Sequence, residues 1–146
     1  MAYRTIAITS NQPPKEGLAS GTIYPGMLLE RTSTANQVQP HSGLADKVFA
    51  NLVAVEDSLQ GNDVDDAYTA TNRCFFKSFL PGDEILGKVA AGQNIAIGDE
   101  LVSNGAGYLK KYFRDSSTAD MENTVFATAL EACVAVAATL CRMEIA

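Results

Sequence analysis

One seven-residue pattern occurs twice in this sequence, as I-x-x-G-x-x-L at Ile23–Leu29 and again at Ile95–Leu101. Each copy is followed by a polar turn and an apolar run that opens with Phe-Ala and ends in Glu, namely Phe49 to Glu56 and Phe126 to Glu131. Duplicated strand-and-turn units are a common way to build a small closed β-structure. The repeat therefore predicts a single β domain, residues 19–146, made of two similar halves at about 21–66 and 67–146.

Short β-favouring runs alternate with glycine, proline and asparagine turns along most of the chain. Pro25-Gly26 and Pro81-Gly82 predict tight turns, and Asn104-Gly105 is a strong hairpin signal because both residues tolerate positive φ. With 47% hydrophobic residues, a chain of 146 residues can bury a substantial core. We expect a mainly β fold, a small antiparallel β-barrel or sandwich built from the two pseudo-repeated strand-turn units.

The C-terminal segment supports two different structures. Its alanine-rich sequence from Phe126 to Leu140 has helical propensity. The echo of the earlier Phe-Ala run, together with the alternation of apolar and polar residues from Leu140 to Ile145, favours β-structure instead. We favour two strands joined near Ala135 to Ala138, with a helix as the alternative.

The first eighteen residues predict an extended N-terminal arm. Pro13 and Pro14 resist regular structure, while Ile6 and Ile8 alternate with threonines in a way that suits a β-strand. Such an arm can add a strand to the sheet edge of a partner protein. The alternative is a frayed end or the first edge strand of this domain itself.

Charge and hydropathy exclude several classes of partner. Seventeen acidic and eleven basic residues give a net charge of −6, which repels polyphosphate and makes a nucleic-acid partner a poor prediction. The longest apolar segment, Val125 to Cys141, contains Glu131 and is shorter than the roughly 20 residues that a membrane helix needs. We therefore expect neither nucleic acid nor membrane as a partner.

No cluster of reactive side chains predicts an enzyme, a cofactor or a metal site. The single histidine, His41, lies in a predicted turn and has no evident nucleophile beside it. A metal-assisted hydrolase that uses Asp63, Asp65 and His41 is the remaining enzyme hypothesis, although the acidic run more simply indicates a solvated turn. The three cysteines, which lack a C-x-x-C spacing, are expected to be buried reduced thiols: Cys74, Cys133 and Cys141.

Four segments of the sequence resemble one family of proteins. In that family a chain rises to a glycine, descends through a hairpin and returns along an Ala-Leu-Glu-Ala strand. The matching segments are Gly92–Leu101, Asn104–Lys110, Val125–Ala132 and Arg142–Ile145. With these segments the chain resembles the capsid decoration proteins of tailed bacteriophages, which are also called cement or head-stabilising proteins, and Gly21 to Glu56 matches the same outline.

The resemblance implies a structural protein of the virion. It implies a non-enzymatic subunit, made in the host bacterial cytoplasm, that assembles as a homotrimer on the outer surface of an expanded head. There it would bind the major capsid protein and bridge neighbouring capsid subunits. The predicted arm would then be the capsid-binding segment, through Tyr3, Arg4, Ile6, Ile8, Pro13, Pro14 and Lys15. Alternatives are another virion structural protein, such as a tail-tube or head-completion component, or a small oligomeric ligand-binding β-barrel.

Overall fold

The computed structural model of the chain describes residues 5–10, 12–42, 51–113 and 125–146. Within these residues the chain is almost entirely β. It forms β1 (Lys15–Ala19), β2 (Leu28–Arg31), β3 (Gln37–Pro40), β4 (Leu52–Ala54), the short 3-10 helix η1 (Ser58–Gln60), β5 (Arg73–Ser78), β6 (Glu84–Val89), β7 (Asn94–Ile95), β8 (Glu100–Ser103), β9 (Leu109–Lys111), β10 (Ala127–Ala129), β11 (Cys133–Val134) and β12 (Thr139–Ile145).

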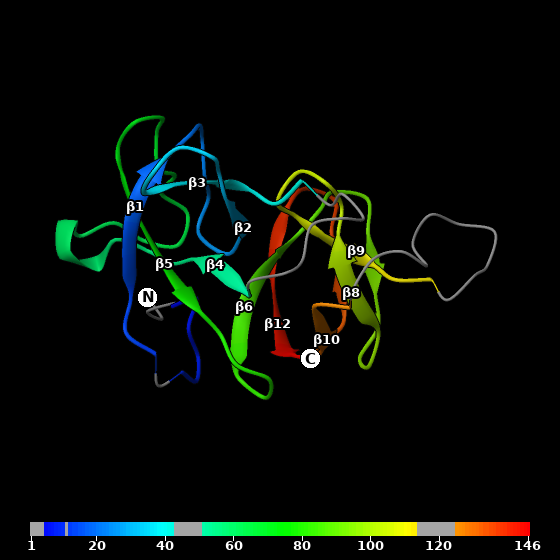
Figure 1. Cartoon of the computed structure of the whole chain (residues 1–146). Coiled ribbons are helices and arrows are strands. Elements are labelled where there is room, and N and C mark those ends of the chain that lie inside the picture. Colours follow the sequence, from blue (N-terminus) through cyan, green and yellow to red (C-terminus); the bar gives the residue numbers. More distant parts are fainter. Residues whose placement is uncertain (1–4, 11, 43–50, 114–124) are drawn as a thin grey trace.

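Ten of these strands close into two five-stranded barrels that lie side by side (Figure 1). Barrel 1 has the order β1-β3-β2-β4-β5, and barrel 2 has the order β6-β9-β8-β10-β12, each closing on its first strand. The remaining strands, β7 and β11, pair with each other as a small two-stranded sheet. The predicted mainly β fold and the barrel architecture are thus confirmed.

The two barrels are equivalent strand by strand, so the repeat in the sequence is a repeat in three dimensions. Each has one parallel pair, β1 with β3 and β6 with β9, and four antiparallel pairs in matching positions. The boundary predicted after residue 66 is wrong, because β5 pairs with β1 and β4 and therefore completes barrel 1. The second unit starts at β6. The first Phe-Ala pair, Phe49 and Ala50, lies outside the described residues.

The repeated glycines produce the same tight turn in each barrel. Gly26 has a φ of 92° and Gly98 a φ of 89°, a conformation that residues with a Cβ rarely adopt. In the first turn the N–H of Met27 donates to the carbonyl of Tyr24, and in the second the N–H of Asp99 donates to the carbonyl of Ala96. The shared sequence pattern therefore encodes a shared backbone turn that leads into β2 and β8.

A second pair of equivalent glycines leaves room for large side chains on the neighbouring strands of the barrels. Gly17 in β1 lies opposite Cys74, and Gly87 in β6 lies opposite Cys141. A Cβ at Gly17 would lie 3.1 Å from the ring of Phe76, and one at Gly87 would lie 2.5 Å from Met143. A missing side chain on one strand thus makes room for a large one on its neighbour in both barrels.

The C-terminal segment forms strands, as favoured from the sequence, and the helical alternative is wrong. β10 lies between β8 and β12, and the side chains of Ala127 and Ala129 point into the core. The chain turns after β11 and enters β12, which pairs with β6 along six residues. Pairing with distant strands therefore overrides the local helical propensity of the alanines.

The predicted N-terminal arm is largely part of the fold. Lys15–Ala19 is β1, which pairs with both β3 and β5, so these residues are a barrel strand rather than a free extension. Upstream, Ala7 forms a bridge with Ile85 of β6, and Ile6 is completely buried. This outcome matches the alternative that the predicted arm is part of this domain. The physical reason is that burying the apolar side chain of Ile6 lowers the free energy of the folded chain.

Candidate functional site

Residues 5–10, here called the N-terminal strap, cross from barrel 1 to the edge of barrel 2. The N–H of Leu86 donates to the carbonyl of Ile6 at 2.9 Å, and the N–H of Ile8 donates to the carbonyl of Glu84 at 3.0 Å. The hydroxyl of Thr9 accepts a further hydrogen bond from the N–H of Glu84. The strap therefore lies along the first half of β6, where that strand has no pairing with β9.

One carboxylate of barrel 1 fastens the strap. Glu56, just after β4, accepts the hydroxyl of Thr5 through one oxygen and the N–H of Ile6 through the other, the latter at 3.1 Å. Hydrogen bonds to an ionised carboxylate are stronger than neutral ones. Sequence analysis did not identify this role, and the only signal for it is that Glu56 ends the apolar run of the repeat.

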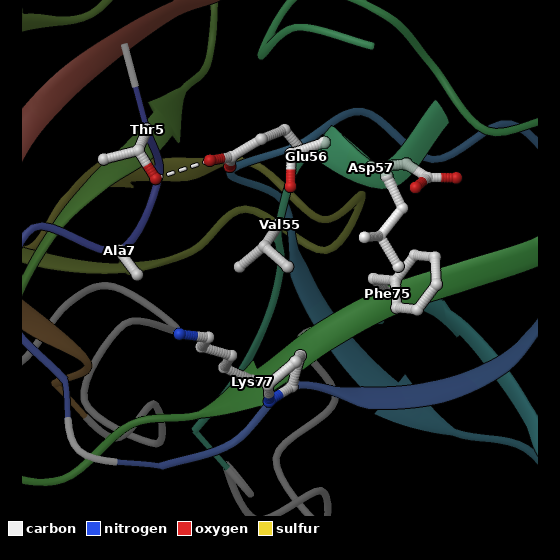
Figure 2. Close-up of a pocket in the computed structure, with 10 residues that line it drawn as sticks. Thr5, Ala7, Val55, Glu56, Asp57, Phe75 and Lys77 are labelled. Carbon is white, nitrogen blue, oxygen red and sulfur yellow. Dashed lines mark hydrogen bonds between the residues drawn. The ribbon is translucent and has the colours of Figure 1, made fainter. Parts of the chain in front are cut away.

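A hollow of about 380 Å³ lies between the strap and barrel 1 (Figure 2). Phe75 and Lys77 project from β5, Thr5 and Ala7 come from the strap, and Asp57 follows Glu56 on the opposite wall. A second, wider hollow lies beside it and shares Phe75 and Asp57. The lining of the first hollow therefore combines apolar side chains, such as Phe75, with the charged groups of Asp57 and Lys77.

The residues of the enzyme hypothesis are not brought together. His41 is buried at the contact between the barrels, where its Nδ1 lies 3.1 Å from the hydroxyl of Ser103. Asp63 instead belongs to a loop turn, in which Asp66 accepts its N–H. Within the described residues no group of three or more His, Cys, Asp or Glu side chains is arranged to hold a metal ion. The same part of the chain has no helix of the length and hydropathy that would cross a membrane.

All three cysteines are free thiols, and two of them are shielded. Burial raises the pKa of Cys74 to about 12, and burial together with the neighbouring Cys133 and Glu131 raises the pKa of Cys141 to about 12. Cys133 is only partly covered, so the expected burial is wrong for this cysteine. The thiolate, which is the reactive form, is therefore suppressed at two of the three positions.

This difference predicts selective labelling of Cys133. In the folded protein at pH 8, the two raised pKa values reduce the thiolate fraction of Cys74 and Cys141 by about a thousandfold. Ellman's reagent should therefore react rapidly with one thiol and with the other two only in urea. Cys133→Ser should remove the rapid phase, and a rapid phase that persists in this variant would contradict the assignment.

The residues predicted to contact a capsid lie in three different environments. Tyr3 and Arg4 lie outside the described residues. Ile6 is in the core, whereas Ile8 is 38% exposed on the strap. Pro13, Pro14 and Lys15 are exposed where the chain enters β1. Of the predicted set, the structure therefore leaves Ile8, the two prolines and Lys15 accessible to a partner.

Taken together, these features define a class of protein by its fold: a tandem of two equivalent five-stranded β-barrels. No protein-family model and no curated protein matches the sequence. Among solved structures, the fold is similar to the head fiber gp8.5 N base of bacteriophage phi29, with a TM-score of 0.57 and 15% sequence identity. The similarity covers 92% of this chain and 94% of the phage chain, so it includes both barrels. At this identity the comparison establishes the fold.

Proposed function

We propose that this protein is a decoration protein of a bacteriophage head. One observation carries the proposal: a fold shared over nearly the whole length with the base of a phage head fiber. The resemblance of the turn and strand segments to capsid decoration proteins supports it independently of the fold. Because the similar structure belongs to a head protein, a head role is better supported than a role in the tail tube.

In this proposal the protein binds the major capsid protein on the outer surface of the virion and bridges adjacent capsid subunits, acting as a homotrimer without cofactor or catalysis. Binding that is restricted to the expanded head stabilises that state by mass action. Several binding sites in one oligomer increase the avidity without requiring any new chemistry. The protein is made in the bacterial cytoplasm and reaches the virion by assembly.

The test is to mix purified protein with expanded and with unexpanded heads of its phage. We expect co-sedimentation with expanded heads, additional density on their outer surface by electron microscopy, and a higher temperature of genome release. Equal binding to both kinds of head would contradict stabilisation of the expanded state. Absence of binding to either would contradict the head role.

Two accessible residues of the predicted capsid-binding set, Ile8 on the strap and Lys15 at the start of β1, give a sharper test of the contact surface. Ile8→Asp combined with Lys15→Glu changes the apolar and basic groups that face solvent, and it leaves the buried Ile6 in place. We expect this variant to fold normally and to lose at least about tenfold in head affinity, as for a central interface residue. Val136→Asp changes a residue that is 91% exposed on the β11 side and serves as the control. Equal occupancy for both variants would argue against capsid binding through the strap.

A further inference from the structure

Barrel 1 docks on barrel 2 through the turn that precedes β2. The carbonyl of Gly26 accepts the N–H of Lys88 at 2.9 Å, and Lys88 Nζ lies 4.8 Å from the centre of the Tyr24 ring. The contact is so close that a Cβ at Gly26 would lie 2.7 Å from Leu140 and 3.1 Å from the carbonyl oxygen of Leu86. The turn therefore seats on the outer side of β6 and β12.

The equivalent turn of barrel 2 has no such seat within the described chain. Its glycine, Gly98, has nothing within 4 Å of the point that a Cβ would occupy, although its φ matches that of Gly26. Ile97 takes the place of the buried Pro25 and is 71% exposed. An ion pair at 3.0 Å between Asp99 and Lys111 holds the turn against β9. Barrel 2 therefore repeats the docking turn of barrel 1 in the same conformation, but no surface of the described residues packs against it at Gly98.

The other half of the contact has equivalent positions on barrel 1, although they carry different side chains. Since Gly17 faces Cys74 as Gly87 faces Cys141, the positions of Leu86, Lys88 and Leu140 correspond to Glu16, Leu18 and Arg73. Leu18 is 46% exposed, and Glu16 and Arg73 form an ion pair at 3.6 Å with both side chains more than half exposed. The outer face of β1 and β5 therefore presents one apolar side chain, Leu18, beside the charged side chains of Glu16 and Arg73.

We propose that copies of this chain associate head to tail, with the Ile97 turn of one copy packed on the Leu18 face of the next. The contact continues the interface that already joins the two barrels within one chain. Each surface carries one pair of opposite charges, Asp99–Lys111 on the turn and Glu16–Arg73 on the face, so neither surface brings a net charge from these residues to the contact. The proposal concerns association between copies and does not depend on whether the assembly binds a head.

The proposed contact between copies lacks one hydrogen bond that the contact between the barrels has, and this limits its strength. The N–H of Leu18 already donates to the carbonyl of Asn36 at 2.7 Å, so the backbone hydrogen bond that Gly26 makes to Lys88 has no counterpart between copies. The contact between copies therefore depends on side chains and is weaker than the internal one. Because its two surfaces differ, it is heterologous, and such a contact forms a closed ring when its rotation permits.

Analytical ultracentrifugation of the full chain, without heads, tests the proposal. The wild-type protein should form oligomers at micromolar concentration, and either Ile97→Asp or Leu18→Asp should weaken association by at least about tenfold. Leu80→Asp is the matched control, since Leu80 is 50% exposed between β5 and β6, belongs to neither surface, and should leave association unchanged. All three positions are exposed, and circular dichroism with thermal melting verifies that each variant folds.

Mixing the two interface variants separates a head-to-tail contact from a symmetric one. Each variant keeps one intact surface, so an equimolar mixture should give a one-to-one heterodimer and nothing larger. A symmetric interface through one of the surfaces would instead give homodimers of the variant that keeps that surface, and no heterodimer. A monomeric wild-type protein, an equal effect of Leu80→Asp, or a mixture that stays monomeric would each overturn the proposal.

Discussion

Gly26→Ala is expected to destabilise the protein by about 3 kcal/mol, against about 1 to 2 kcal/mol for Gly98→Ala. Both glycines have a φ near 90°, where an added Cβ costs about 1 to 2 kcal/mol. Only at Gly26 does that Cβ also meet barrel 2, at 2.7 Å from Leu140 and at 3.1 Å from a backbone oxygen. Overpacking of this kind costs about 1 to 3 kcal/mol more.

Urea unfolding of the two variants measures the difference directly. Because the turns share their conformation, the strain of positive φ is common to both, and the difference isolates the contact between the barrels. A Gly26 variant that is no less stable than the Gly98 variant would show that the barrels do not depend on this contact. Two-state unfolding of the wild type is the condition under which the comparison holds.

Ile6→Ala is expected to cost about 2 to 5 kcal/mol, which is the range for a fully buried aliphatic side chain. Ile6 belongs to the larger core cluster, which contains residues of both barrels, such as Leu28 and Met143. Its loss would leave a cavity where the strap, barrel 1 and barrel 2 meet. The strap would then lose the apolar contribution that complements its hydrogen bonds to β6.

Ile8→Ala is the matched control, two residues away on the same segment. Ile8 is partly exposed, so its truncation is expected to change the free energy of unfolding by less than about 1 kcal/mol. Denaturant melts of both variants decide the question, and equal losses of stability would show that the strap is not anchored through Ile6.

The structure also predicts the result of removing the N-terminal arm. Deleting residues 2–18 would remove most of β1, which closes barrel 1 against β3 and β5. Such a deletion should prevent folding rather than leave an intact subunit that fails to bind. The experiments on head binding therefore use point variants at exposed positions.

A small barrel of about sixty residues buries too little surface to be strongly stable alone. In this chain the two barrels share a core cluster, a docked turn and a strap fastened by Glu56. Each of these contacts joins segments that are far apart in the sequence. Stability of one barrel is therefore coupled to the presence of the other.

Several features of this protein follow from the sequence alone, because they depend on neighbouring residues. Glycines at the two repeated turns, the Asn104-Gly105 hairpin and the alternating runs all reflect local backbone preference. They are sufficient to predict a mainly β fold and its internal repeat. A role without catalysis is also expected from the single histidine, and it stays a prediction.

Only the tertiary structure decided which strands close each barrel and where the repeat divides. β5 joins β1 rather than β6, and the strap pairs with β6 of its own chain, since each contact depends on burial across a long stretch of intervening chain. The same holds for the two turns: Gly26 and Gly98 have one local conformation, yet one is covered and the other is open. Local sequence specifies the shape of a turn, whereas its burial is set by the surface that the rest of the chain brings against it.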